Sequence, residues 1–172
     1  MRLILFALIF MASTEIQSQN AKRIERSASF IAMAEVGRVF PLFGPVREKE
    51  WAPGWSPELI YSTHPEVEEH MIFKTASNTV EEEQYLWSVT QYKPAEFFVE
   101  YLVSTPNRVW FISVKGAPQN KETNVTVRYA YTSLNELGIQ LNKTALEKMF
   151  AEDLKDWAEA VNFYLATGKR LE

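Results

Sequence analysis

The chain has 172 residues, 47% of them hydrophobic and 23% charged, with a net charge of −4, values typical of one folded domain and not of a disordered chain. The mild acidic balance, with no Lys/Arg cluster interleaved with aromatic residues, argues against nucleic acid as a partner. Cysteine is absent, which excludes disulfides, thiolate metal sites and thiol nucleophiles, so the fold must be stabilised by packing.

The first residues are typical of a secretory signal peptide. Arg2 supplies one positive charge, residues 3–12 form an unbroken apolar run, and a polar stretch follows. As a helix the apolar run would reach about 15 Å, roughly half of a bilayer core. We therefore expect a signal peptide over residues 1–21, no stable membrane anchor, and an exported protein, periplasmic or secreted, whose folded domain covers residues 22–172. The alternative is that the apolar run belongs to the fold itself.

The next elements are a strand, a helical stretch and a series of strands. Residues 24–31 alternate as a first strand, and residues 34–43 have helical spacing, with a break expected at Pro41 and a second short helix near Gly44. Six β-rich runs follow, about ten residues apart and with no helix between them. They span residues 58–63, 69–76, 82–92, 97–105, 108–115 and 123–134. This order predicts an antiparallel meander and excludes a parallel βαβ sheet.

One hairpin of the meander has a register that the sequence predicts. A two-residue turn at positions 106–107 places Val103 opposite Trp110 and Tyr101 opposite Ile112, all on one face. We expect this face to be the core face.

The same register orients the neighbouring side chains. It sends Glu100 and Arg128 to the outer face, so the inner face is expected to be apolar and aromatic, without an acid–base pair. The orientation of residues 84–92, and therefore of Trp87, depends on the length of the loop around Pro94 and stays open.

The last segment has the strongest helical pattern of the chain. Apolar residues recur at steps of three and four, at Leu146, Phe150, Leu154, Trp157, Val161 and Leu165. Thr144 and Glu147 form a T-x-x-E capping box, and Gly168 provides a C-terminal stop. We expect one helix of about 24 residues lying across the sheet.

This order of elements resembles the START-like or helix-grip superfamily, which includes the birch-pollen allergen type and the bacterial SRPBCC and polyketide cyclase-like proteins. Residues 45–55, with the W-x-P-G-W stretch, and residues 125–138 look like matching segments of small bacterial members. The resemblance implies an α+β helix-grip fold, in which a curved antiparallel sheet of about seven strands carries two short helices and a long C-terminal helix. It also implies a cavity between sheet and helix that holds lipids, sterols, polyketides or other hydrophobic molecules.

The expected ligand-binding residues are large side chains on the inner face and at the cavity mouth. They are Trp51, Trp55, Trp87, Tyr101, Val103, Trp110, Ile112, Tyr129 and Trp157. Trp51 and Trp55 flank a Pro-Gly turn and could gate the cavity or plug the core. Tyr101, Trp110, Tyr129 and Tyr131 could offer polar groups to a ligand or fill an aromatic core.

The sequence offers little for catalysis or metal binding. The run from His64 to His70 holds ligand-type residues, but Pro65 places it in a solvated turn, so we expect no metal and no cofactor. There is no nucleophile motif, and no catalytic residue is assigned.

Three functions are compatible with these features. The first is non-catalytic binding or transport of a hydrophobic small molecule. The second is a polyketide cyclase or dehydratase-like enzyme, and an inward carboxylate would favour it. The third is a structural or partner-binding protein, and a filled core would favour it. The oligomeric state cannot be read from the sequence.

Overall fold

One antiparallel sheet organises the molecule. The computed structural model describes residues 23–172, with the side chains of all of them except residues 149, 150 and 152; the expected signal peptide lies outside the described residues. Within this part of the chain, seven strands pair in the order β1-β7-β6-β5-β4-β3-β2. They are β1 (Arg23–Ala32), β2 (Glu58–Tyr61), β3 (Ile72–Ala76), β4 (Gln84–Lys93), β5 (Phe98–Ser104), β6 (Arg108–Gln119) and β7 (Glu122–Ser133). The expected strand followed by a six-stranded meander is confirmed.

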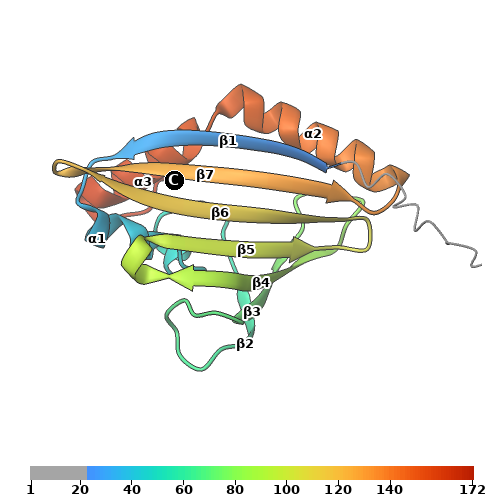
Figure 1. The fold of residues 1–172 in the computed structure, drawn as a ribbon, viewed down its shortest axis with the longest axis horizontal. Coiled ribbons are helices and arrows are strands. Elements are labelled where there is room, and N and C mark those ends of the chain that lie inside the picture. The colour runs from blue at the N-terminus through green and yellow to red at the C-terminus, as the bar shows by residue number, and fades with distance from the viewer. Residues whose placement is uncertain (1–22) are drawn as a thin grey trace, which may run out of the picture.

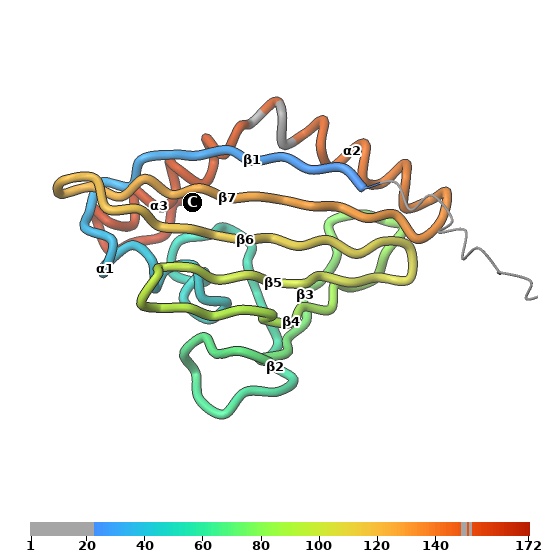
Figure 2. The backbone as a smooth tube through the Cα atoms, in the orientation of Figure 1, coloured from blue at the N-terminus to red at the C-terminus, as the bar shows by residue number. Residues whose placement is uncertain are grey.

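The helices lie on one side of this sheet, behind it in Figure 1. The N-terminal group comprises α1 (Val36–Val39), η1 (Phe40–Phe43) and η2 (Arg47–Glu50), a short η3 (Pro94–Glu96) joins β4 to β5, and the C-terminal pair is α2 (Glu136–Glu152) and α3 (Lys155–Thr167). The backbone trace in Figure 2 shows α3 at the same end as α1, and α2 packs against β7 and β6. None of the described helices is long and apolar enough to cross a membrane.

The predicted hairpin register is confirmed. Val103 pairs with Trp110 and Tyr101 with Ile112, and all four side chains are buried. Alternation along β5 and β6 follows from the period of two, because every second side chain turns to the side that the helices cover. Strand β6 continues to Gln119, beyond the expected end at residue 115.

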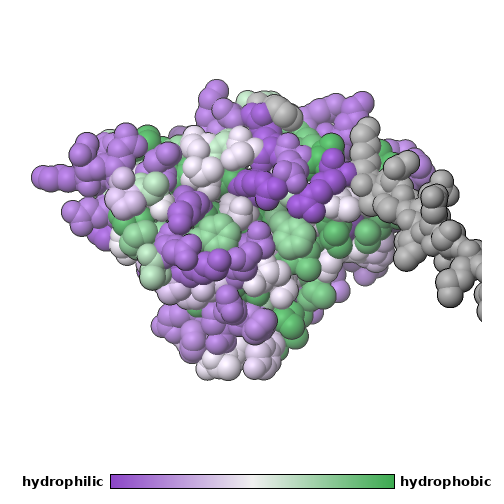
Figure 3. All heavy atoms as spheres, in the orientation of Figure 1, coloured by the Kyte–Doolittle hydropathy of each residue, from purple (hydrophilic) through white to green (hydrophobic). Residues whose placement is uncertain are grey.

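The outer face of the sheet carries hydrogen-bonded polar groups beside exposed apolar side chains such as Leu86. Glu100 accepts hydrogen bonds from Thr90 Oγ1 at 3.0 Å and from Gln91 Nε2 at 3.1 Å, and Arg128 pairs with Glu25 at 2.5 Å. Figure 3 shows hydrophilic side chains over much of this face and hydrophobic ones gathered in its right half. The expected outward orientation of Glu100 and Arg128 is therefore confirmed.

The C-terminal helical segment differs from the expected single helix. It begins at Glu136, eight residues before the expected cap, with the Asn135 side chain accepting the Gly138 N–H at 2.9 Å. The capping box at Thr144 is wrong, because the Thr144 hydroxyl bonds back to the Gln140 carbonyl inside the helix. The stop is confirmed at Gly168, which has φ +68° and donates to the Tyr164 carbonyl at 2.7 Å.

A break divides this segment in two. Asp153 and Leu154 adopt left-handed backbone with φ of 49° and 61°, which ends α2 and redirects the chain into α3. Asp153 pairs with Arg26 of β1 at 2.7 Å, and the Leu154 side chain is buried. Buried Leu146, Leu154 and Val161 therefore still cover the sheet, whereas the side chain of Phe150 lies outside the described ones.

Candidate functional site

A cavity of about 540 Å³ lies between the inner face of the sheet and the helices. Its floor is formed by strands β3 to β7, one wall by η2 and the loop after it, and the opposite wall by α2, α3 and the break between them. The volume is within the range of small-molecule sites. A filled core, which would have favoured a structural protein, is therefore not what the fold contains.

Most of the expected ligand-binding residues line this cavity. They are Trp51, Trp55, Trp87, Tyr101, Trp110, Ile112, Tyr129 and Trp157. Val103 is fully buried but is not among the lining residues, because it lies between Trp87 and Trp110 on the neighbouring strands, and their larger rings reach the cavity instead.

Trp87 points inward, which answers the question that the sequence left open. Its ring stacks on Phe73 with centroids 5.4 Å apart, and its indole N–H donates to Thr75 Oγ1 at 3.1 Å. A register shift between Val89 and Gln91 inserts an extra residue into β4. The extra residue reverses which alternate side chains point inward on its two sides. Simple alternation of apolar and polar residues could not locate it.

The two tryptophans beside the Pro-Gly turn have different roles. Trp51 is 2% exposed and donates to the Leu42 carbonyl at 2.7 Å, so it belongs mainly to the core. Trp55 is partly exposed, donates to the Pro45 carbonyl at 2.7 Å and meets Trp87 edge to face at 5.3 Å. Only Trp55 has the position of a residue at a cavity mouth.

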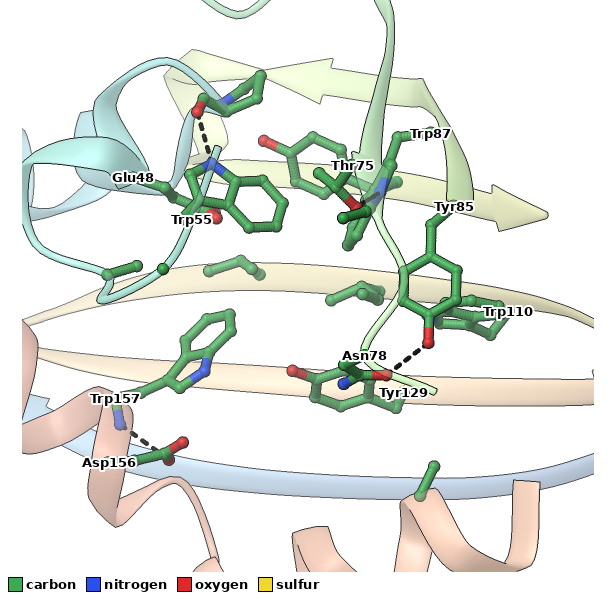
Figure 4. A pocket seen from close by; sticks show the side chains of 18 of the residues that line it. Glu48, Trp55, Thr75, Asn78, Tyr85, Trp87, Trp110, Tyr129, Asp156 and Trp157 are labelled. Carbon is green, nitrogen blue, oxygen red and sulfur yellow. Dashed lines mark hydrogen bonds between the residues drawn. The ribbon is translucent and has the colours of Figure 1, made fainter. Parts of the chain in front are cut away.

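Trp157 faces this pair from α3. Its ring is stacked 6.1 Å from Phe43 and lies edge to face 5.5 Å from Trp51. It keeps part of its surface exposed and borders the cavity (Figure 4). Phe43, Trp51 and Trp157 thus pack as one aromatic cluster, of which Trp51 and Trp157 line the cavity.

The tyrosine hydroxyls on the cavity floor differ in their hydrogen bonding. Tyr101 donates its hydroxyl to the Phe43 carbonyl at 2.5 Å, whereas the Tyr129 hydroxyl has no hydrogen-bond partner among the described residues. Burial raises the pKa of Tyr129 well above its usual value and that of Tyr131 to about 12. Both phenols are therefore neutral donors at ordinary pH, and Tyr129 is free to bind a ligand.

Glu48, on η2, is a lining carboxyl that the sequence analysis missed. It lies beside Trp55 on the cavity wall (Figure 4), and no described residue forms a hydrogen bond or ion pair with its carboxyl group. Part of the residue is exposed, as in other cavity-lining residues, yet burial raises the pKa of the carboxyl well above its usual value. The sequence predicted an inner face of the sheet without an acid–base pair, and Glu48 is a single carboxyl that comes from η2 and not from the sheet.

A second acidic residue is buried at the far end of the cavity, where it forms an ion pair. Glu82 and Arg108 meet at 2.7 Å, with side chains 1% and 3% exposed. The guanidinium lies over the Trp110 ring, 4.8 Å from its centroid, and Thr105 donates to the other Glu82 oxygen at 2.6 Å. The sequence places residue 82 in the acidic connection at the start of the expected strand 82–92, and its pattern does not predict the ion pair with Arg108.

The part of the chain that the structure describes has no candidate metal site. No group of three or more His, Cys, Asp or Glu side chains could hold an ion there. His64 lies 3.3 Å from Glu66 and 3.4 Å from Glu68 in an exposed loop, and Glu68 is already engaged by Thr63 and Ser62.

The Glu48 carboxyl makes stability depend on pH. Its pKa is raised in the folded state, so the contribution of Glu48 to stability is complete below the unfolded pKa of about 4.5 and is lost as the pH rises towards the folded value. Glu48→Gln should therefore raise the free energy of unfolding by about 1–3 kcal/mol at about pH 8 and change it little at about pH 4. Urea unfolding at both pH values measures this, with exposed Glu159→Gln as control. An equal effect at both pH values would contradict it.

Comparison with known proteins identifies the fold. No protein-family model and no curated protein matches the chain. Norcoclaurine synthase from Thalictrum flavum, solved with dopamine and hydroxybenzaldehyde, superposes with a TM-score of 0.66 over 98% of both chains at 12% identity. The Zhui aromatase/cyclase from Streptomyces sp. R1128 gives 0.64 over 87% of this chain and 99% of that chain at 8% identity. Ara h 8.0201 gives 0.57 over 84% and 99% at 11% identity.

These similarities confirm the predicted α+β helix-grip fold. At such low identity they establish the fold and not an activity. The neighbours also include proteins named as enzymes, a synthase and a cyclase, so the fold is compatible with both binding and catalysis.

Proposed function

We propose that this protein binds a hydrophobic small molecule, of lipid, sterol or polyketide-like character, in the cavity between its sheet and helices. The observation that carries this proposal is the cavity of about 540 Å³ with a lining dominated by indole and phenol rings. Ring faces and edges favour flat, ring-containing ligands, because stacked and edge-to-face contacts add to the energy of burial.

The role proposed for this binding is carriage without chemical change. Asp156 is exposed, the Arg108–Glu82 pair is saturated by its own contacts, and Tyr101 is held by a backbone carbonyl. These groups do not form a relay with a nucleophile. The signal-peptide pattern places the carrier outside the cytoplasm, and this remains a prediction from the sequence.

A second candidate function is favoured by one observation, the inward carboxyl of Glu48. A carboxyl whose pKa is raised by burial can act as a general acid or base at neutral pH, as a cyclase or dehydratase-like enzyme would require. A carrier returns its ligand unchanged, whereas an enzyme does not. Mass spectrometry of the ligand recovered after incubation with the protein therefore distinguishes the two.

Filling part of the cavity should weaken binding. Ala145 lines it from α2, so Ala145→Trp should lower the affinity for methylnaphthalene, followed by quenching of tryptophan fluorescence, by about tenfold or more. The reason is that the new indole ring occupies part of the cavity volume. A ligand must then bind in an overpacked site, at a cost of about 1–3 kcal/mol.

The matched control is Ala151→Trp, which adds the same ring at an exposed position of the same helix. It should leave the affinity unchanged. Equal affinities of the two variants and the wild-type protein would place the probe outside the cavity and contradict the proposal.

A further inference from the structure

The end of the cavity beside η2 combines a carboxyl with indole rings. Glu48 and Trp55 lie together on the wall that η2 and its following loop form, and Trp157 faces them from α3 (Figure 4). Because no described residue pairs with the Glu48 carboxyl, the protein itself supplies no donor to this strong acceptor. Such a group costs free energy unless something supplies the missing partner.

The charges around this end do not balance. The ionisable side chains that line the cavity besides Glu48 are Tyr85, Tyr101, Arg108, Tyr129, Tyr131, Lys148 and Asp156. Arg108 is neutralised by Glu82 at 2.7 Å, and Lys148 is exposed on α2, where solvent screens it. Glu48 and Asp156 both act on Tyr129, raising the pKa of its phenol further. Asp156 is exposed like Lys148 and opposite to it in sign, so the charge that Glu48 carries once it is ionised has no counter-charge in the cavity wall, and apolar walls strengthen its potential.

Aromatic rings complement this potential for a cation. The faces of indole and phenol rings are negative and attract ammonium groups, and the attraction is largest where water is excluded. A neutral hydroxyl would donate a hydrogen bond to Glu48 but would not compensate the charge of its carboxylate. An anion would be repelled by it. A protonated amine supplies both a donor and the compensating charge.

From the proposed function we infer that the ligand is a hydrophobic amine whose ammonium group binds Glu48 between Trp55 and Trp157. Its apolar body then occupies the space over the floor of the cavity. The ammonium keeps its proton, and a protonated Glu48 carboxyl releases its own proton to solvent as the ion pair forms. No covalent bond to carbon changes in this step.

The test uses three probes of one size: methylnaphthalene, naphthalenemethanol and naphthylmethylamine. On the wild-type protein the amine should bind roughly 10- to 100-fold more tightly than the alcohol, as expected for a charge-assisted hydrogen bond. Calorimetry in two buffers of different ionisation enthalpy should show proton release with the amine and none with the other two probes. In Glu48→Gln the preference for the amine and the proton release should both disappear, while methylnaphthalene binds as before. Exposed Glu159→Gln should retain the wild-type pattern.

The outcomes separate the two proposals. If methylnaphthalene binds but the amine is no tighter than the alcohol, the amine inference is wrong and the binding proposal stands. If the amine preference persists in Glu48→Gln, the inference is also overturned, since another group would then provide it. If none of the probes binds, the proposed function itself fails. The wild-type comparison needs no variant, so a folding defect cannot obscure the result.

Discussion

Glu82→Gln is expected to destabilise the fold by about 3–5 kcal/mol, because it leaves the Arg108 guanidinium buried without its counter-charge. Arg108 is 3% exposed, donates to Glu82 through Nε and Nη2 at 3.2 and 2.7 Å, and reaches Tyr85 at 3.4 Å. A neutral amide in place of the carboxylate can accept a hydrogen bond but cannot compensate the charge. Urea unfolding of the variant measures the loss.

Two further variants sharpen this result. Glu81→Gln changes a neighbouring exposed carboxylate of the same loop and should be neutral within about 0.5 kcal/mol. Glu82→Gln combined with Arg108→Met removes the stranded charge and should recover much of the lost stability. A single variant as stable as the wild-type protein would show that solvent reaches the guanidinium, and the pair would then not be a buried one.

The strands could be predicted because their side-chain alternation is a direct physical consequence of one covered face. Tyr101, Val103, Trp110 and Ile112 are large and apolar at every second position, so only one register buries them all. Trp87 could not be oriented in the same way, because the register shift after Val89 leaves no mark in the hydrophobic pattern.

The C-terminal segment was predicted as helix but not as two helices. The apolar stripe continues across the break, since Leu154 within it and Leu146 and Val161 on either side are all buried. The break itself depends on left-handed backbone at Asp153 and Leu154 and on the ion pair of Asp153 with Arg26. These are tertiary features that a periodic pattern does not encode.

The polar part of the site was the least predictable. Glu48 lies in a single turn of 3-10 helix, too short to show a period. One signal was present: Glu48 and Trp51 are three residues apart, so a helical turn places them on the same face, and a buried Trp51 implies an inward Glu48. Glu82 precedes β4 and Arg108 begins β6, and only the antiparallel order of the meander places these two strand starts at the same end of the sheet.

Trp157 should carry both the packing of α3 and the shape of the cavity. Its ring contacts Phe43 and Trp51 at 6.1 and 5.5 Å and borders the void. Trp157→Ala should lower the free energy of unfolding by about 3 kcal/mol, the low end for a large aromatic residue because one side of the ring already lacks packed neighbours. For a domain of this size the melting temperature should fall by roughly 6–12 °C.

The same variant should change ligand preference in a defined direction. Removing the ring enlarges the cavity and deletes a stacking surface, so methylnaphthalene should bind more weakly while the larger pyrene should lose less or gain affinity. The ratio of the two affinities should shift towards pyrene by up to about tenfold, the value of one aromatic contact. Trp157→Phe keeps a stacking ring against Phe43 and should fall between the two proteins in both measurements. If Trp157→Ala melts at the wild-type temperature and keeps the wild-type affinity ratio, the ring lies outside both the core and the binding site, and α3 must be held to the sheet by Val161 and its neighbours instead.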